Sequence, residues 1–182
     1  MTEAPATPAA CQSTSAAPRI VRLQRRDVEA FRTVRLRALQ EHPEAFGSSY
    51  QEESQYDDSG FARMLPDPPG CTLGAFDGEC LVGIANLHVP EQLKQRHKGT
   101  INGVYVIPAF RRAGLACALL RALLAEARGV GLRTVQLSVT VGNEPARRLY
   151  AGLGFETYGI ERRALMVEGR FLDEALMALL LD

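Results

Sequence analysis

Arg111-Arg112-Ala113-Gly114-Leu115-Ala116 joins a predicted strand to a predicted helix, and the fold of the chain follows from this stretch. The residues before it, 100–106 (TINGVYV), are rich in β-branched side chains, and Pro108 ends the strand that they predict. After it, leucines recur at helical spacing until Gly129 and Gly131, which predicts a helix. These leucines are Leu115, Leu119, Leu120, Leu123 and Leu124.

The loop itself has the features of an anion site. A helix that begins here leaves several main-chain N–H groups unpaired and directs the positive end of its dipole at the loop. Gly114 has no Cβ, so a phosphate can approach the backbone, and Arg111 and Arg112 add positive charge. An ordinary strand-to-helix turn with two solvated arginines would share these six residues, so the choice depends on a second element.

That second element lies about thirty residues further on. Residues 135–139 predict another strand, and residues 140–143 lead from it to Glu144-Pro-Ala-Arg-Arg-Leu-Tyr-Ala-Gly-Leu-Gly-Phe155. The combination of R-x-x-G-x-A with N-x-x-A-x-x-L-Y-x-x-L-G-F resembles the GNAT acetyltransferase superfamily, whose members use acetyl-CoA. The resemblance covers roughly residues 20–181, and the downstream motif is its more specific part. By contrast, the chain lacks the G-x-x-x-x-G-K-[ST] and G-x-G-x-x-G patterns of other phosphate loops.

The resemblance implies an α/β (mixed α+β) fold with a central, mostly antiparallel mixed sheet of six to seven strands and helices on both faces. Predicted hairpin strands come first and a parallel crossover later, which is compatible with this fold. The strands that end at Val106 and Val139 would splay apart and admit the acyl-pantetheine arm like an added strand. Residues 1–18 are rich in Ala, Pro, Ser and Thr, so we expect a disordered tail before a single acetyltransferase domain over 19–182.

The remaining elements follow from local signals. Asp27 is expected to cap a helix that ends near residues 41–43, and Asp77-Gly78 predicts the turn of a hairpin. The expected segments are a strand at 20–23, a short helix at about 59–64, hairpin strands at 72–76 and 79–88, and C-terminal strands at 164–167 and within 175–181.

The resemblance also assigns the cofactor site. It implies that acetyl-CoA contacts the strand residues Val104, Tyr105 and Val106 and the loop residues Arg111, Arg112, Ala113, Gly114, Leu115 and Ala116. Asn143 would bind the pantetheine arm or neighbouring backbone, and it can cap the following helix at the same time. Tyr150 would lie near the thioester sulfur, where a phenol can protonate the departing thiolate as a general acid. The plainer interpretation of Tyr150 is a core tyrosine with a satisfied hydroxyl.

The general base stays open. Some relatives carry a Glu where this chain has Ser138, and others carry one on the first splayed strand, where it has Thr100 and Asn102. His97 has a suitable intrinsic pKa, although its surroundings also read as an exposed loop. The alternatives are a water chain from Asn102 or Ser138, or one of Glu41, Glu44, Glu52 and Glu53.

The resemblance places the acceptor pocket beside Phe46, Tyr50 and the segment 161–173. The three histidines show no metal-ligand spacing, so we expect no metal. Cys117 is a rival nucleophile for a ping-pong route, but its place on the helix after the loop favours packing.

Composition limits the partners. Lys and Arg number 21 and Asp and Glu number 21, so net charge gives no case for nucleic acid or an anionic membrane, and no apolar run is long enough for a membrane span. The N-terminus lacks an apolar signal segment, and no C-x-x-C pairing occurs, so we expect reduced thiols in a cytoplasmic protein. The cysteines are Cys11, Cys71, Cys80 and Cys117.

Three function classes follow. The first is an N-acetyltransferase that moves acetyl from acetyl-CoA directly to a primary amine of a small molecule, a peptide or a protein N-terminus, as a monomer or a homodimer. The second is a noncatalytic acyl-CoA-binding or sensor domain of the same fold. The third, another kind of nucleotide-binding module, is disfavoured by the missing phosphate-loop patterns. Tyr150 favours the first class, and Ser138 leaves room for the second.

Overall fold

The computed structural model describes residues 17–181. The predicted tail over 1–18 therefore lies outside the described residues, apart from its last two positions.

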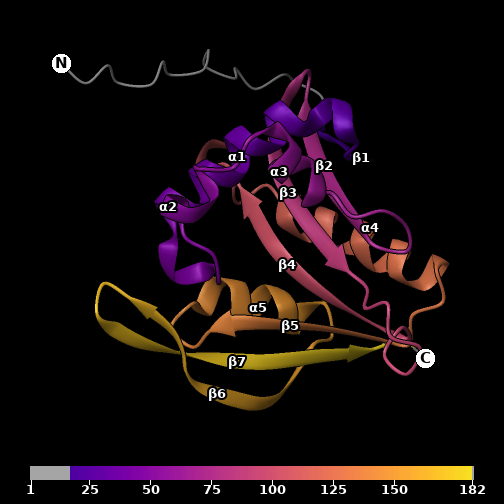
Figure 1. The fold of residues 1–182 in the computed structure, drawn as a ribbon. Coiled ribbons are helices and arrows are strands. Elements are labelled where there is room, and N and C mark those ends of the chain that lie inside the picture. The colour runs from indigo at the N-terminus through magenta and orange to yellow at the C-terminus, as the bar shows by residue number, and fades with distance from the viewer. Residues whose placement is uncertain (1–16, 182) are drawn as a thin grey trace.

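One seven-stranded sheet forms the centre of the fold, in the order β1-β2-β3-β4-β5-β7-β6 (Figure 1). Only β4 and β5 run parallel, and every other neighbouring pair is antiparallel. This confirms the predicted mostly antiparallel mixed sheet. The strands are β1 (Arg19–Arg22), β2 (Cys71–Asp77), β3 (Cys80–His88), β4 (Lys98–Val106), β5 (Thr134–Thr140), β6 (Glu156–Val167) and β7 (Arg170–Leu180).

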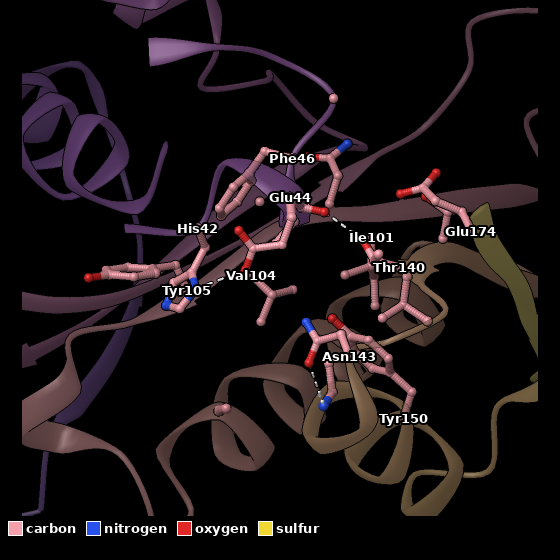
Figure 2. Close-up of a pocket in the computed structure, with 18 of the residues that line it drawn as sticks. His42, Glu44, Phe46, Ile101, Val104, Tyr105, Thr140, Asn143, Tyr150 and Glu174 are labelled. Atoms are coloured by element: carbon pink, nitrogen blue, oxygen red, sulfur yellow. Dashed lines mark hydrogen bonds and ion pairs between the residues drawn. The ribbon is translucent and has the colours of Figure 1, made fainter. Parts of the chain in front are cut away.

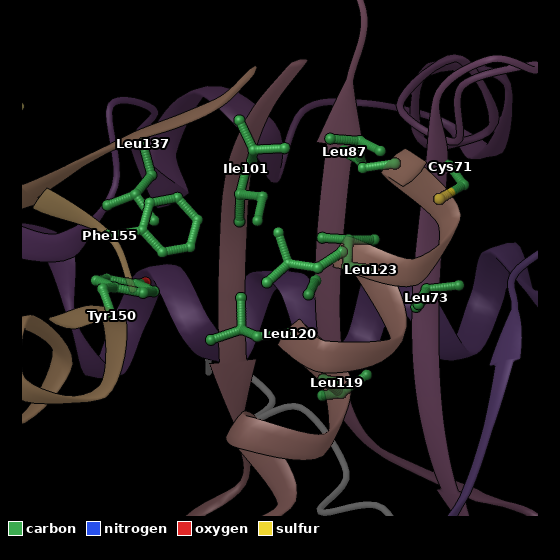
Figure 3. Close-up of a cluster of buried hydrophobic side chains, with 14 of the residues drawn as sticks. Cys71, Leu73, Leu87, Ile101, Leu119, Leu120, Leu123, Leu137, Tyr150 and Phe155 are labelled. Atoms are coloured by element: carbon green, nitrogen blue, oxygen red, sulfur yellow. The ribbon is translucent and has the colours of Figure 1, made fainter. Parts of the chain in front are cut away.

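Helices cover both faces of the sheet. They are α1 (Val28–Glu41), α2 (Tyr50–Glu53), α3 (Asp58–Arg63), α4 (Leu115–Gly129) and α5 (Glu144–Gly152), with 3-10 turns η1 (Arg25–Asp27), η2 (Pro43–Ala45) and η3 (Pro108–Phe110). Successive residues of β3 alternate between two cores, because side chains on a strand point to opposite faces. Leu81 belongs to the core that includes residues of α1 and α3, whereas Val82 belongs to the core that includes residues of α4 and α5. Figure 3 shows part of this second core, with Leu119, Leu120 and Leu123 of α4. No helix within residues 17–181 is long and apolar enough to cross a membrane.

The C-terminal hairpin is longer than the sequence predicts. β6 has 12 residues and β7 has 11, so the strands expected at 164–167 and within 175–181 are only parts of it. Most side chains of β6 are exposed, and their polar character hides the apolar alternation that marks a strand. The one-turn helix α2 was also missed, although Ser49 and Glu52 form the capping box that starts it.

The thiols divide into two kinds. Cys71 and Cys117 are free, as predicted. Cys80 is disulfide-bonded, so the expectation of a reduced thiol is wrong at that position. The prediction rested on the absence of a C-x-x-C pair and of a signal segment, and neither tells which cysteines the fold brings together.

The parallel pair β4–β5 separates soon after it starts. Only Lys98, Gly99 and Thr100 pair with β5, opposite residues 134–136, and the two strands then diverge (Figure 1). Further along β4, the register with β3 shifts between Asn102 and Tyr105, and Gly103 adopts a φ of 63°. A bulge of this kind bends a strand and redirects its side chains. The predicted splay is therefore present.

The core on the α4 side should dominate stability. Leu120 is fully buried there, so Leu120→Ala should lower the free energy of unfolding by about 2–5 kcal/mol through lost contacts and a cavity. Leu93 is 75% exposed, and Leu93→Ala should change it by less than about 0.5 kcal/mol. Urea unfolding of both variants measures the difference, and equal values would contradict this description of the core.

Candidate active site

A cavity of about 1070 Å³ opens where β4 and β5 separate (Figure 2). Its walls come from the middle of β4, the end of β5, the start of α5, η2 with the residues after it, and β7. The cavity lining includes Arg35, His42, Glu44, Phe46, Asn102, Val104, Tyr105, Val106, Arg111, Ala116, Ser138, Thr140, Asn143, Tyr150, Leu172 and Glu174.

The loop before α4 carries a row of free donors. The first helical hydrogen bond runs from the Ala118 N–H to the Gly114 carbonyl at 2.9 Å. The main-chain N–H groups of residues 112–117 have no acceptor within residues 17–181. Gly114 takes a left-handed φ of 78°, and a Cβ there would meet no atom within 4 Å. The loop therefore presents open, unpaired donors to solvent at the positive end of a helix.

The loop residues do not all face the cavity. Arg111 and Ala116 line it, whereas Arg112, Ala113 and Gly114 are exposed outside it. Leu115 is buried in the α4 core. The loop thus lies at the mouth of the cavity and contributes main-chain groups more than side chains.

The Arg111 guanidinium is already engaged. Its Nε donates to the Val106 carbonyl at 2.7 Å, and its Nη2 lies 3.6 Å from a Glu41 carboxylate oxygen. It also stacks over the Tyr105 ring at 5.4 Å. Sequence reasoning treated this side chain as free charge for a phosphate, but the structure uses it to tie the end of β4 to α1.

Tyr105 and Glu41 complete that tie. The Tyr105 hydroxyl donates to Glu41 at 2.6 Å. Burial alone would raise the pKa of Glu41, but hydrogen bonds from Tyr105 and Arg37 outweigh it and hold that pKa below its ordinary value. Burial and then this hydrogen bond raise the pKa of Tyr105. A carboxylate held ionised in this way is a poor proton acceptor.

Tyr150 reaches the cavity from α5 (Figure 2). Its side chain is 8% exposed, its ring packs edge-on against Phe155 at 6.1 Å, and its hydroxyl has no hydrogen-bond partner within residues 17–181. Burial raises the pKa of this phenol to about 12. At neutral pH the Tyr150 hydroxyl is therefore protonated, and no group within residues 17–181 accepts its hydrogen bond. A core tyrosine whose hydroxyl has a hydrogen-bond partner, the plainer interpretation of the sequence, would differ in this respect.

Asn143 and Thr140 hold the end of β5 in place. Asn143 caps α5 by accepting from the Ala146 N–H at 3.2 Å, and it also lines the cavity. The Thr140 hydroxyl donates to the Glu44 carbonyl at 2.5 Å and so joins β5 to η2 across the cavity.

Most of the base candidates lie elsewhere. His97 is exposed outside the cavity, and its carbonyl accepts from the Arg133 and Thr134 N–H groups where β4 and β5 begin. We therefore do not retain His97. Glu52 caps α2, and Glu53 is buried in an ion pair with Arg35 at 2.6 Å.

The groups that remain at the cavity are fewer. Glu44 lines it, as do the exposed residues Asn102 and Ser138, which suit a water chain. Glu174 on β7 lines it too and was missed by sequence reasoning. Its only signal was its position at the edge of a predicted strand, and its place in the cavity depends on pairing with Thr140 of β5.

Only some of the residues that were predicted to bind the acceptor line the cavity. Phe46 lines the cavity, with the Arg35 guanidinium 5.0 Å from its ring centre. Tyr50 packs in the α1 core outside the cavity. From the segment 161–173, Leu172 alone is in the lining.

Two other expectations concern metals and thiols. Within residues 17–181 no group of three or more His, Cys, Asp or Glu side chains could hold a metal ion. Cys117 sits in the first turn of α4 outside the cavity lining, where its Sγ accepts from Arg121 at 3.3 Å.

The chain is similar to known proteins in sequence and in fold. The model of the acetyltransferase (GNAT) family matches residues 35–155. The N-alpha-acetyltransferase RimI of Mycobacterium tuberculosis is 33% identical over 111 residues, which are 61% of this chain and 68% of that protein. The L-amino acid N-acetyltransferase AaaT of Escherichia coli is 28% identical over 84% of this chain and 91% of that protein. The structure of yncA from Salmonella typhimurium with acetyl-CoA has a TM-score of 0.78 at 24% identity, and covers 92% of this chain and 95% of that one.

The buried ion pair behind the cavity should be essential to the fold. Glu53→Gln leaves the Arg35 guanidinium, 10% exposed, without its countercharge, and should cost about 3–5 kcal/mol of unfolding free energy. Glu91→Gln, at an exposed loop position, should be nearly neutral. Chemical denaturation compares the two, and a Glu53→Gln cost below about 1 kcal/mol would contradict the role given to this pair.

Proposed function

Because this chain belongs to the acetyltransferase (GNAT) family, we propose that it transfers an acetyl group from acetyl-CoA directly to a primary amine of a small molecule, a peptide or a protein N-terminus. The observation that carries the proposal is the row of unpaired N–H groups at residues 112–117, at the mouth of a cavity between two diverging strands.

The residues present fit acetyl-CoA. Successive free N–H groups at a helix N-terminus suit a pyrophosphate, and the open space at Gly114 lets it approach the backbone. Beyond residue 100, β4 and β5 no longer pair with each other, so an extended pantetheine arm has strand edges to follow. Acetyl-CoA supplies the activated acetyl group and a thiolate as the leaving group.

The chain supplies proton transfer and positioning. A neutral amine forms the new C–N bond as the C–S bond breaks, and the thiolate takes its proton from Tyr150. The proton that the amine loses passes to Glu44, to Glu174 or to water held by Asn102 and Ser138. All of these groups line the cavity.

Two alternatives predict different behaviour. A noncatalytic acyl-CoA-binding domain would bind the cofactor and release no thiol with any amine. A ping-pong route through Cys117 would leave an acetylated enzyme, which mass spectrometry detects. The place of Cys117 outside the cavity lining favours direct transfer.

The loop assignment can be tested by a charge at Gly114. Gly114→Asp puts a carboxylate where the proposal puts the pyrophosphate, so the Kd for CoA in calorimetry should rise at least about a hundredfold. Gly131→Asp is the matched control, because Gly131 has a similar left-handed φ of 81° and open space around it, but it lies beyond the far end of α4. Unchanged affinity in Gly114→Asp, with an unchanged melting temperature, would remove the loop from the cofactor site.

The general acid can be tested by removing one oxygen. Tyr150→Phe keeps the ring and its contact with Phe155, so kcat should fall about a hundredfold or more while CoA affinity stays close to the wild-type value. Tyr158→Phe, at a 59% exposed tyrosine, should change neither. Full activity in Tyr150→Phe would exclude Tyr150 from the chemistry.

The pH dependence gives an independent check. Because burial raises the pKa of Tyr150 to about 12, the phenol stays protonated across the working range. The kcat profile should therefore show no alkaline loss from this acid below about pH 11. An alkaline limb with a pKa near 10 that disappears in Tyr150→Phe would contradict this account.

A further inference from the structure

The positive groups of the cavity are already neutralised. The Arg35 guanidinium makes two hydrogen bonds to the Glu53 carboxylate, at 2.9 and 2.6 Å. The Arg111 guanidinium lies beside Glu41 and donates to the Val106 carbonyl. Among the lining residues, neither arginine therefore offers an unpaired charge to an acceptor carboxylate.

The His42 ring is engaged on both of its nitrogens. The Arg111 Nη2 lies 3.1 Å from His42 Nε2, and because a guanidinium can only donate, Nε2 accepts there. His42 Nδ1 lies 3.3 Å from Glu44 Oε1. Apart from this histidine, the Glu44 carboxylate has no basic side chain in ion-pair distance within residues 17–181.

Two carboxylates of the cavity have no arginine or lysine partner within residues 17–181. Glu44 and Glu174 both line the cavity, and neither has an arginine or lysine in ion-pair distance. Both residues lie beside Thr140 along the backbone, because the Glu44 main-chain carbonyl accepts from Thr140 and Glu174 pairs with Thr140 in the sheet. Their carboxylates point to different sides of the cavity, that of Glu44 toward His42 (Figure 2). Glu161 stands opposite Glu174 on β6 and adds a third negative charge beside it. Like charges opposite each other on neighbouring strands repel.

We propose that the acceptor is an amine with a second positive charge and no carboxylate, of the aliphatic diamine class. This inference rests on the proposed acetyl transfer. One amino group, as the free base, lies near the unpartnered Tyr150 hydroxyl, and the distal ammonium group pairs with the carboxylate of Glu44 or of Glu174. The distal ammonium offsets the negative charge that these carboxylates place at the cavity, and the carboxylate of an α-amino acid would add to that charge.

A series of equal chain length tests the charge alone. The compounds are 1,4-diaminobutane, butylamine and 4-aminobutyrate, whose distal ends are positive, neutral and negative at neutral pH. We expect kcat/KM for the diamine to exceed that for butylamine at least about tenfold, beyond the factor of two for its two equivalent amines, and 4-aminobutyrate to be poorest. Thiol release measures the rate, and mass spectrometry identifies the product.

The possible outcomes distinguish a wrong acceptor assignment from a wrong proposed function. Equal rates for the diamine and butylamine, a preference for 4-aminobutyrate, or no turnover of the diamine by enzyme that binds acetyl-CoA would each overturn the acceptor assignment. Failure to bind acetyl-CoA would instead overturn the proposed function.

Substitutions of the two glutamates test which residues bind the distal ammonium group. Glu44→Gln or Glu174→Gln should lower the ratio of diamine to butylamine kcat/KM, according to which carboxylate pairs with the distal ammonium, and the double variant should bring it close to two. A purely catalytic base would lower both rates alike and leave the ratio unchanged, which would overturn the assignment. Glu156→Gln, an exposed glutamate on the same hairpin, is the matched control and should keep the wild-type ratio.

Discussion

The early end of pairing between β4 and β5 is the constraint on which the rest of the structure depends. After Thr100 and Gln136 the two strands part, although each stays paired on its other side, β4 with β3 and β5 with β7. A single sheet thus contains a wedge without losing its continuity. The wedge brings together groups from α1, η2, α5 and β7 that are far apart in the sequence.

The two sides of the wedge have different tasks. On the α4 side, leucines bury one face of the helix, so its first turn is held rigidly with its N–H groups open to solvent. On the α1 side, ion pairs and hydrogen bonds hold the wall. Arg35 with Glu53, and Arg111 with Glu41 and Tyr105, are contacts of this kind. The positive charges of the two arginines in this wall are therefore already paired within the fold.

Local sequence signals predict the parts of the site that are local. The leucine spacing of α4, Gly114 at its start and the Asn143 cap of α5 follow from neighbours within a few residues. The ion pair of Arg111 with Glu41 cannot be predicted in this way, because Glu41 lies seventy positions away in the sequence and only the fold brings it near. Glu174 is similar: its role depends on the register of β7 with Thr140, and the neighbouring strand β6, which is mostly exposed, carries little apolar pattern. His97 lies outside the cavity lining because β4 begins beside it, at the closed end of the wedge.

The central claim is that the free N–H groups before α4 and the wedge beyond residue 100 form one acetyl-CoA site. Amide hydrogen exchange, measured residue by residue with and without acetyl-CoA, tests it most directly. The account predicts that the amides of residues 112–117, unpaired in the structure, exchange much more slowly when acetyl-CoA is bound, together with those at the divergent ends of β4 and β5. Unchanged exchange at residues 112–117, under conditions where calorimetry shows binding, would contradict it.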